Sequence, residues 1–286
     1  MNIRTALALS LVMLTTSVYA AEQSSTLEMI EKSGKIRIGY RESEPPMSYL
    51  GDDGKPIGYS IDLCARIVTG VKAKLGKSKI SVEYVPVSSA NRFTALSDNK
   101  IDILCGSTTK TLSRGELVDF TQLTFVTGAS LLSLVSNPID NVSDLQGKKV
   151  AVVTDTTTIV ALKDALKNAL TEAEVVPVDS AAAGMKALQE GKVDAYSSDQ
   201  VVLIGLILMS DDPTRFVVAR QLFSFEPFAL AVRRNDADFR LVADRVLSHL
   251  YRRGQIGQIY VRWFGRFSKE VPTAVQAVYA INSTPE

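Results

Sequence analysis

An alternation of strand and helix patterns that begins a second time halfway along the chain limits the fold more than any other feature. The first series predicts strands at Lys35–Tyr40, Ser81–Val87 and Ile101–Cys105, with helices at Tyr59–Lys74 and Asn91–Asp98. The second series has the same order, and its elements are Lys148–Val153, Thr158–Leu170, Val175–Val178, Ala181–Gln189 and Val193–Tyr196. This alternation predicts an α/β fold with mainly parallel sheets and helices on their faces.

The two series also share residues at a constant offset. Each pair is 92 residues apart, and the pairs are Ala95 with Ala187, Leu96 with Leu188, Lys100 with Lys192, and Asp102 with Asp194. The same offset places Ser107 opposite Asp199, each just past the carboxyl end of a predicted strand. Open α/β sheets bind ligands at that end of the strands. We therefore expect two similar lobes, each contributing polar groups to one site.

Two apolar, β-prone stretches, Leu123–Val135 and Leu222–Val232, flank the second series. They predict a chain that enters the second lobe once and leaves it once, which is a natural hinge. Helices between Asp236 and Phe267 would then pack back on the first lobe. The apolar run Val201–Met209 is too short to span a bilayer, so we expect a buried helix there.

The first twenty residues have the order of a secretory signal peptide. Arg4 supplies a positive charge, Ala6–Leu14 is a compact apolar run, and Val18-Tyr19-Ala20 offers small residues for cleavage. A membrane anchor is the alternative, but the apolar run is far below the ~20 residues that a spanning helix needs. We therefore expect export, with cleavage near Ala20.

The composition argues against nucleic-acid binding, metal binding and catalysis. The 32 basic residues balance 31 acidic ones, so no nucleic-acid contact is indicated. Cys64, Cys105 and a single histidine, His249, are too few for a zinc or iron–sulfur site built on those ligands, and no cofactor is predicted. The cysteines could form a disulfide in an oxidising compartment or remain two buried thiols. His249 lies in an amphipathic helical stretch, and no nucleophile or nucleotide motif accompanies it.

The segment GSTTKTLSR, Gly106–Arg114, offers the clearest ligand chemistry. It follows a predicted strand, presents the hydroxyls of Ser107, Thr108 and Thr109, and ends on a guanidinium. A helix beginning near Thr109 would direct free N–H groups at the same space, and such a terminus attracts anions. Arg114 could then grip a carboxylate with two parallel hydrogen bonds. An ordinary capped helix with a solvated arginine fits the local pattern equally well.

A set of motifs in order, GYRES, GYSIDL, SSANR, KIDILCGSTT followed by Arg114, and DFTQLTFVTG, resembles the family 3 bacterial extracellular solute-binding proteins. Within that family it is most similar to the glutamate/aspartate-binding branch of ABC importers, over about residues 27 to 267. The resemblance implies a two-lobed periplasmic-binding-protein fold, also called a Venus flytrap, with two crossover hinge strands. It implies lobe one at 27–126 and 228–270, lobe two at 127–227, and a C-terminal tail at 271–286.

The resemblance also implies a role for individual residues. Arg114, Ser107 and Thr109 match the groups that hold the α-carboxylate, and Asp199 matches the carboxylate that receives the α-ammonium. The second-lobe hydroxyl loop corresponds to Thr157 and Thr158. Three further residues match those around a distal carboxylate, namely Arg41, Ser89 and Arg92. Two extra guanidiniums in one pocket are costly to desolvate unless an anion neutralises them, although either arginine could instead pair with Glu42, Glu44 or Asp98 and face water.

Two positions depart from the family pattern. Thr156 stands where the family often has glycine, which puts the backbone of the loop in question. Ala181 stands where the branch often has a histidine near the ligand, which could shift preference among Glu, Asp, Gln and Asn. We expect a monomeric periplasmic protein that closes on an amino acid and presents it to importer membrane subunits. A cyclohexadienyl-type dehydratase and a ligand-presenting sensor are the alternatives on the same fold.

Overall fold

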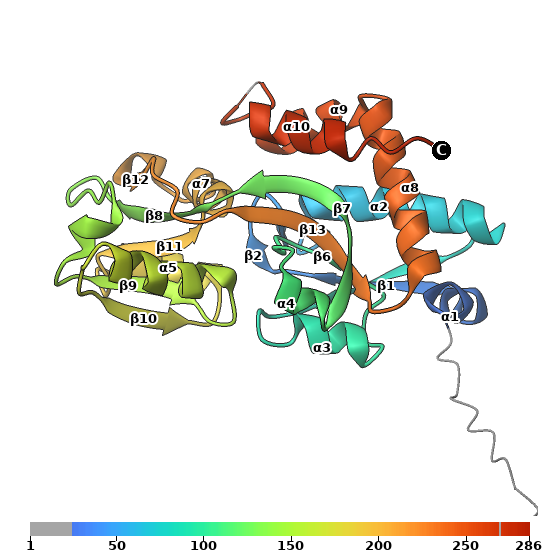
Figure 1. Cartoon of the computed structure of the whole chain (residues 1–286), viewed down its shortest axis with the longest axis horizontal. Helices are drawn as coiled ribbons and strands as arrows, with labels where there is room; N and C mark the ends of the chain where they lie inside the picture. Colours follow the sequence, from blue (N-terminus) through green and yellow to red (C-terminus); the bar gives the residue numbers. More distant parts are fainter. Residues whose placement is uncertain (1–24, 269) are drawn as a thin grey trace, which may run out of the picture.

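The computed structural model describes residues 25–268 and 270–286, so the predicted signal peptide lies outside the described residues. Two five-stranded sheets form two lobes that lie side by side, joined by extended strands (Figure 1). The two-lobed α/β prediction is thus confirmed. In the described part of the chain, none of the helices has the length and apolar character needed to cross a membrane.

The sheet of lobe one has four strands that run in one direction and one strand, β13, that is antiparallel to its neighbours. Its order is β5 (Ser81–Pro86), β1 (Lys35–Tyr40), β6 (Ile103–Cys105), β13 (Glu226–Arg233) and β7 (Val118–Thr127). A small antiparallel sheet extends this lobe within the stretch predicted only as turn-rich, and its strands are β2 (Ser43–Glu44), β3 (Ser48–Leu50) and β4 (Pro56–Ile57). β2 matters for function because it faces lobe two.

The sheet of lobe two has the same plan. Its order is β10 (Glu174–Val178), β9 (Lys149–Val153), β11 (Ala195–Asp199), β8 (Ala129–Leu134) and β12 (Phe216–Val218), with β8 antiparallel to its neighbours. The two matched aspartates make equivalent hydrogen bonds in the two lobes. The Asp102 carboxylate accepts one from the Arg37 backbone N–H at 2.8 Å, and the Asp194 carboxylate accepts one from the Lys149 backbone N–H at 2.8 Å. The matched residues therefore reflect one structural unit used twice.

Helices cover both sheets. In lobe one they are α1 (Thr26–Ser33), α2 (Tyr59–Leu75), α3 (Arg92–Ser97), α4 (Leu112–Gly115), α8 (Ala237–Arg252), α9 (Gln255–Phe264) and α10 (Thr273–Ile281). In lobe two they are η1 (Val142–Leu145), α5 (Thr157–Asn168), α6 (Ala181–Gln189), α7 (Gln200–Leu208) and η2 (Pro213–Arg215), where η marks a 3₁₀ helix. The apolar run at Val201–Met209 forms α7, which is largely buried as predicted.

The C-terminal helices pack on lobe one, as the sequence predicts. The segment predicted as a tail contains α10, an element that the sequence pattern did not indicate. Tyr279 of α10 is buried, stacks on Tyr251 at 5.2 Å between ring centroids, and places its hydroxyl 2.9 Å from that of Tyr59. α10 is therefore part of the lobe-one core.

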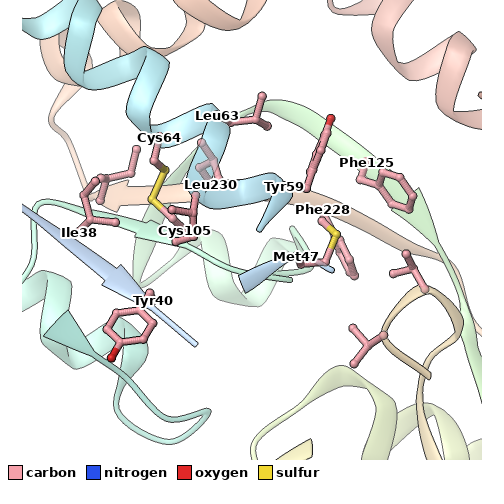
Figure 2. Packing of buried hydrophobic residues seen from close by; sticks show 14 of the residues in the cluster. Ile38, Tyr40, Met47, Tyr59, Leu63, Cys64, Cys105, Phe125, Phe228 and Leu230 are labelled. Carbon is pink, nitrogen blue, oxygen red and sulfur yellow. A yellow bond between two sulfur atoms is a disulfide. The ribbon is translucent and has the colours of Figure 1, made fainter. Parts of the chain in front are cut away.

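A disulfide joins Cys64 of α2 to Cys105 at the end of β6, which resolves the two alternatives left by the sequence. Figure 2 shows it inside the lobe-one core, beside Ile38 and Leu230 and near the aromatic residues Tyr59, Phe125 and Phe228. The disulfide fixes the strand immediately before Gly106–Arg114 to the longest helix of the lobe. This anchors the start of the segment that carries the predicted anion site.

The two crossovers pass close to each other. β7 ends at Thr127 and β8 begins at Ala129, with Gly128 between them, while β13 begins at Glu226 beside the end of β7 (Figure 1). A Cβ added at Gly128 would lie 2.4 Å from the Ser224 carbonyl oxygen, so only glycine fits between the two segments. The lobes are therefore linked by two adjacent extended segments with little side-chain bulk at the point of crossing.

Candidate functional site: a charged cavity between the lobes

Most of the predicted binding residues lie around one cavity between the two lobes. Its walls from lobe one include Arg41, Arg92, Ser107, Thr109 and Arg114, and its walls from lobe two include Thr157, Thr158 and Asp199. Ser89 is not on the wall; its hydroxyl instead accepts a hydrogen bond from Arg41 at 2.8 Å. Both lobes thus contribute the residues that the sequence offset and the resemblance predicted.

The lobes touch each other around this cavity. Arg92 of lobe one donates to the Asp155 carbonyl of lobe two at 2.9 Å, and the hydroxyls of Thr109 and Thr157 are 3.3 Å apart. The cavity that remains has a volume of about 30 Å³, room for about two water molecules. An amino acid is larger than this volume. It can enter only if the lobes separate and the lining side chains move.

The prediction of a helix near Thr109 is wrong. α4 begins at Leu112 and is four residues long, and its capping residue Thr111 accepts the Arg114 amide at 3.1 Å. The reason is the strand-like contact just before it, where Lys110 donates to the Pro227 carbonyl and Ala229 donates to that of Thr108. These bonds hold the chain extended along β13, so a helix cannot start at Thr109.

The helix terminus at the cavity belongs to lobe two instead. α5 begins at Thr157, so Thr157 and Thr158 lie in its first turn, where unpaired N–H groups and the helix dipole favour an anion. Thr156 caps this helix with a φ of −112°, a conformation open to any residue. The positive φ of 56° falls on Asp155. Threonine at 156 is therefore compatible with the loop.

Three guanidiniums approach one another in lobe one. Arg92 is buried, donates to the Ser89 carbonyl at 2.8 Å, and has an Nε–H with no partner among the described residues. Burial first, and then the charges of Arg114 and Arg41, lower the pKa of Arg92 to about 9. Burial also lowers the pKa of Arg114, whose Nη1 donates to the Thr109 carbonyl at 2.9 Å. This part of the cavity would therefore be stabilised by an anion.

Arg41 has an internal partner. Its guanidinium lies 2.9 Å from the Glu44 carboxylate, whose other oxygen accepts the Ser107 hydroxyl. The alternative weighed from the sequence, an Arg41–Glu44 ion pair, is therefore present. The same alternative also expected the paired arginine to face water. That expectation is wrong, because Arg41 is only 7% exposed and lines the cavity. Arg92 pairs with no carboxylate in the described part of the chain.

Asp199 supplies the opposite charge from lobe two. It is the last residue of β11, is buried, and has an Oδ1 with no hydrogen-bond partner among the described residues. Burial first, then the charges of Glu226 and Glu44, raises the pKa of Asp199 well above its ordinary value, although Arg114 and Arg92 oppose the shift. A buried carboxylate oxygen aimed at a cavity is suited to receive an ammonium group.

Sequence reasoning missed Glu226. It is 2% exposed at the start of β13, and its carboxylate accepts hydrogen bonds from Thr109 at 2.5 Å, Thr157 at 2.7 Å and Ser224 at 2.7 Å. One carboxylate thus holds hydroxyls from both lobes beside the crossover. The one available signal was a lone acidic residue inside the apolar run Leu222–Val232.

Tyr196, also missed, lines the cavity from β11, and its buried hydroxyl has no partner in the described part of the chain. The described residues contain no group of three or more His, Cys, Asp or Glu side chains that could hold a metal ion. His249 lies on α8, exposed and away from the cavity wall. The site therefore consists of guanidiniums, hydroxyls and carboxylates.

Comparison with known proteins finds relatives over most of the chain. A family model described as bacterial extracellular solute-binding proteins, family 3, matches residues 36–266. The chain is 34% identical over 88% of its length to the L-glutamate/L-aspartate-binding protein of Pseudomonas aeruginosa, covering 84% of that protein. It is 30% identical over 86% of its length to the glutamate/aspartate import solute-binding protein of Salmonella typhimurium, covering 81% of that protein.

A solved structure shares the fold. The cysteine-binding protein from Campylobacter jejuni superposes with a TM-score of 0.76 at 26% identity, covering 88% of this chain and 98% of that one. The covered share of this chain exceeds the length of either lobe, so the likeness includes residues of both. These relatives carry the names of binding proteins.

Proposed function

We propose that this chain, a member of the family 3 bacterial extracellular solute-binding proteins, binds an acidic amino acid between its lobes and presents it to the membrane subunits of an ABC importer. The observation that carries the proposal is the charge pattern of the cavity. Arg114 and the pair Arg41 and Arg92 suit two carboxylates, while Asp199 across the cavity suits one ammonium group. The named ligands of two curated relatives, glutamate and aspartate, have this pattern of charges.

In this proposal the ligand binds first to lobe one, through Arg114 and Ser107. Lobe two then closes and adds Asp199 together with the hydroxyls of Thr157 and Thr158. The crossovers near 126–127 and 227–228 are the proposed hinge, dividing lobe one at 27–126 and 228–270 from lobe two at 127–227. Exclusion of water on closure strengthens each charge pair. Ser89 acts indirectly, since it orients Arg41 through its hydroxyl.

The setting follows from the family, whose members are extracellular solute-binding proteins. We propose the periplasm as the compartment, reached after cleavage near Ala20, and a monomer as the working form. A disulfide buried in the lobe-one core is compatible with an oxidising compartment.

Titration calorimetry with the twenty amino acids, on wild type and Arg114→Ala, tests the proposal. Removing one partner of a buried charged contact costs about 2–5 kcal/mol, so affinity for glutamate or aspartate should fall by roughly 30-fold or more. Arg220→Ala is the matched control, because Arg220 is exposed and outside the cavity. Undiminished affinity in Arg114→Ala, or no amino-acid binding by the wild type, would refute the assignment.

One observation keeps an enzymatic function testable. The raised pKa of Asp199 gives the cavity a carboxyl group that can hold a proton near bound ligand, as a dehydratase acid must. Incubation with arogenate or prephenate, followed by chromatography, distinguishes the two: substrate that stays unchanged supports binding alone. A ligand-presenting sensor would share every feature of the cavity and differ only in its membrane partner.

A further inference from the structure

Glu44 occupies donors that the two carboxylates of an acidic ligand would need. Its carboxylate accepts from Arg41 at 2.9 Å and from the Ser107 hydroxyl, and the glutamate is only 9% exposed on β2. Arg41 is itself packed against Gly106, where an added Cβ would lie 3.0 Å from the arginine Cγ. Because this packing restricts the guanidinium, a ligand carboxylate that reaches Arg41 has to share or displace Glu44.

The charges around the cavity already cancel in their ionised forms. Three guanidiniums, those of Arg41, Arg92 and Arg114, stand against three buried carboxylates, those of Glu44, Asp199 and Glu226. An amide amino acid adds one carboxylate and one ammonium and leaves the sum unchanged. An acidic amino acid adds one negative charge to a closed cavity, and burying an uncompensated charge is strongly unfavourable.

We propose that Glu44 couples the binding of an acidic amino acid to the uptake of one proton, and that it lets an amide amino acid bind without one. The inference rests on the proposed function, because it assigns the ligand side chain to the subsite of Arg41 and Arg92. Protonated Glu44 gives up its ion pair with Arg41 and can donate to the incoming carboxylate. The neutral residue thereby turns a repulsive contact into a hydrogen bond.

The other ionisable groups that face Glu44 account for the proton less well. Asp199 receives the α-ammonium of either ligand class, so any proton that it gives up on binding is released with both classes alike and does not distinguish them. Tyr196, on the same strand, has a pKa raised by burial and so stays neutral. Glu226 keeps three hydroxyl donors. The remaining neighbours are the guanidiniums of Arg41, Arg92 and Arg114, which are not proton acceptors at neutral pH.

Affinity measured against pH gives the first test. If one proton more is taken up with L-glutamate than with L-glutamine, the ratio of their association constants should fall about tenfold for each pH unit between pH 6 and 8. Calorimetry in phosphate and in Tris, buffers with different ionisation enthalpies, counts the protons directly. We expect about one proton more to be taken up per glutamate than per glutamine.

Glu44→Gln gives the second test. The variant should bind glutamate more tightly than wild type at pH 8, by tenfold or more, with the same proton count for glutamate as for glutamine. Glu42→Gln is the matched control, since Glu42 is exposed on the same segment, and it should retain the wild-type linkage. Equal proton counts for glutamate and glutamine in wild type, or a difference of one proton retained in Glu44→Gln, overturns the inference while leaving the proposed function standing. Wild type that binds neither amino acid refutes both.

Discussion

Replacing Asp199 by asparagine separates two effects of this carboxylate. One is its cost to the stability of the unliganded protein, and the other is its contribution to amino-acid binding. The side chain is buried, and one of its oxygens has no hydrogen-bond partner in the described part of the chain. Its pKa is raised even though two arginines oppose the shift, so the ionised form is disfavoured after all neighbours are counted. We therefore expect Asp199→Asn to stabilise the unliganded protein while it removes amino-acid binding.

The magnitude follows from the buried charge, because asparagine keeps an oxygen at this position but removes the extra cost of leaving it charged. A buried polar group without a partner costs about 1–3 kcal/mol. For a chain of this size each kcal/mol moves the melting temperature by about 2–4 °C. Asp199→Asn should therefore melt about 2–12 °C above the wild type near neutral pH.

The difference should depend on pH in one direction. A carboxyl group whose folded-state pKa is raised binds its proton more tightly in the native state, so stability falls as pH rises from the unfolded pKa through the folded one. Below about pH 4, the ordinary pKa of aspartic acid, both states are protonated and the penalty vanishes. The excess stability of Asp199→Asn should grow between pH 5 and 8.

Differential scanning calorimetry over that pH range, with and without amino acid, measures both effects. Ligand should raise the melting temperature of the wild type by linkage and leave that of the variant unchanged. Asp211→Asn is the control, because Asp211 is exposed and outside the cavity wall. A variant that melts below the wild type at pH 8, or that still binds amino acid with wild-type affinity, would refute the reasoning.

The remaining predictions concern the disulfide and the contact between the lobes. Reduction, or a Cys64→Ala/Cys105→Ala double variant, opens a 41-residue loop and should destabilise the protein by about 4 kcal/mol; a urea midpoint equal to that of the oxidised protein would count against this. Gly205→Ala places a Cβ 2.2 Å from the Pro45 carbonyl oxygen across the lobe interface, so closure should weaken and affinity fall about tenfold or more. Gly257→Ala, with no atom within 4 Å of the added Cβ, should bind as wild type in the same calorimetric titration.

Short-range patterns made much of the fold predictable. The strand and helix assignments of both series agree with the structure to within a few residues, because alternating and helical apolar spacing are local properties. The offset of 92 residues predicted more, since Ser107 and Asp199 do line the same cavity from opposite lobes. A repeat can predict long-range proximity that a single local pattern cannot. It indicates that two distant segments occupy equivalent positions in two similar lobes.

The features that escaped prediction depend on contacts between distant segments. α4 starts late because Thr108 and Lys110 bond to β13, more than 100 residues further along the chain. Glu226 is buried because hydroxyls from both lobes surround it, and its sequence neighbours reveal neither of them. Glu44 was one of three acidic residues that could have paired with Arg41, and only the turn between β1 and β2 selects it.

Glu44 and Glu226 reduce the net free energy that a ligand gains from its contacts in the cavity. The donors of Arg41, Ser107, Thr109 and Thr157 are already satisfied by Glu44 and Glu226. A ligand therefore gains the difference between its own contacts and the ones it replaces, rather than their full value. Micromolar affinity, about −8 kcal/mol, is then compatible with three arginines in one cavity. An internal contact that re-forms as the ligand leaves also lowers the barrier to release. This exchange of contacts therefore favours a protein that must release its ligand to a partner.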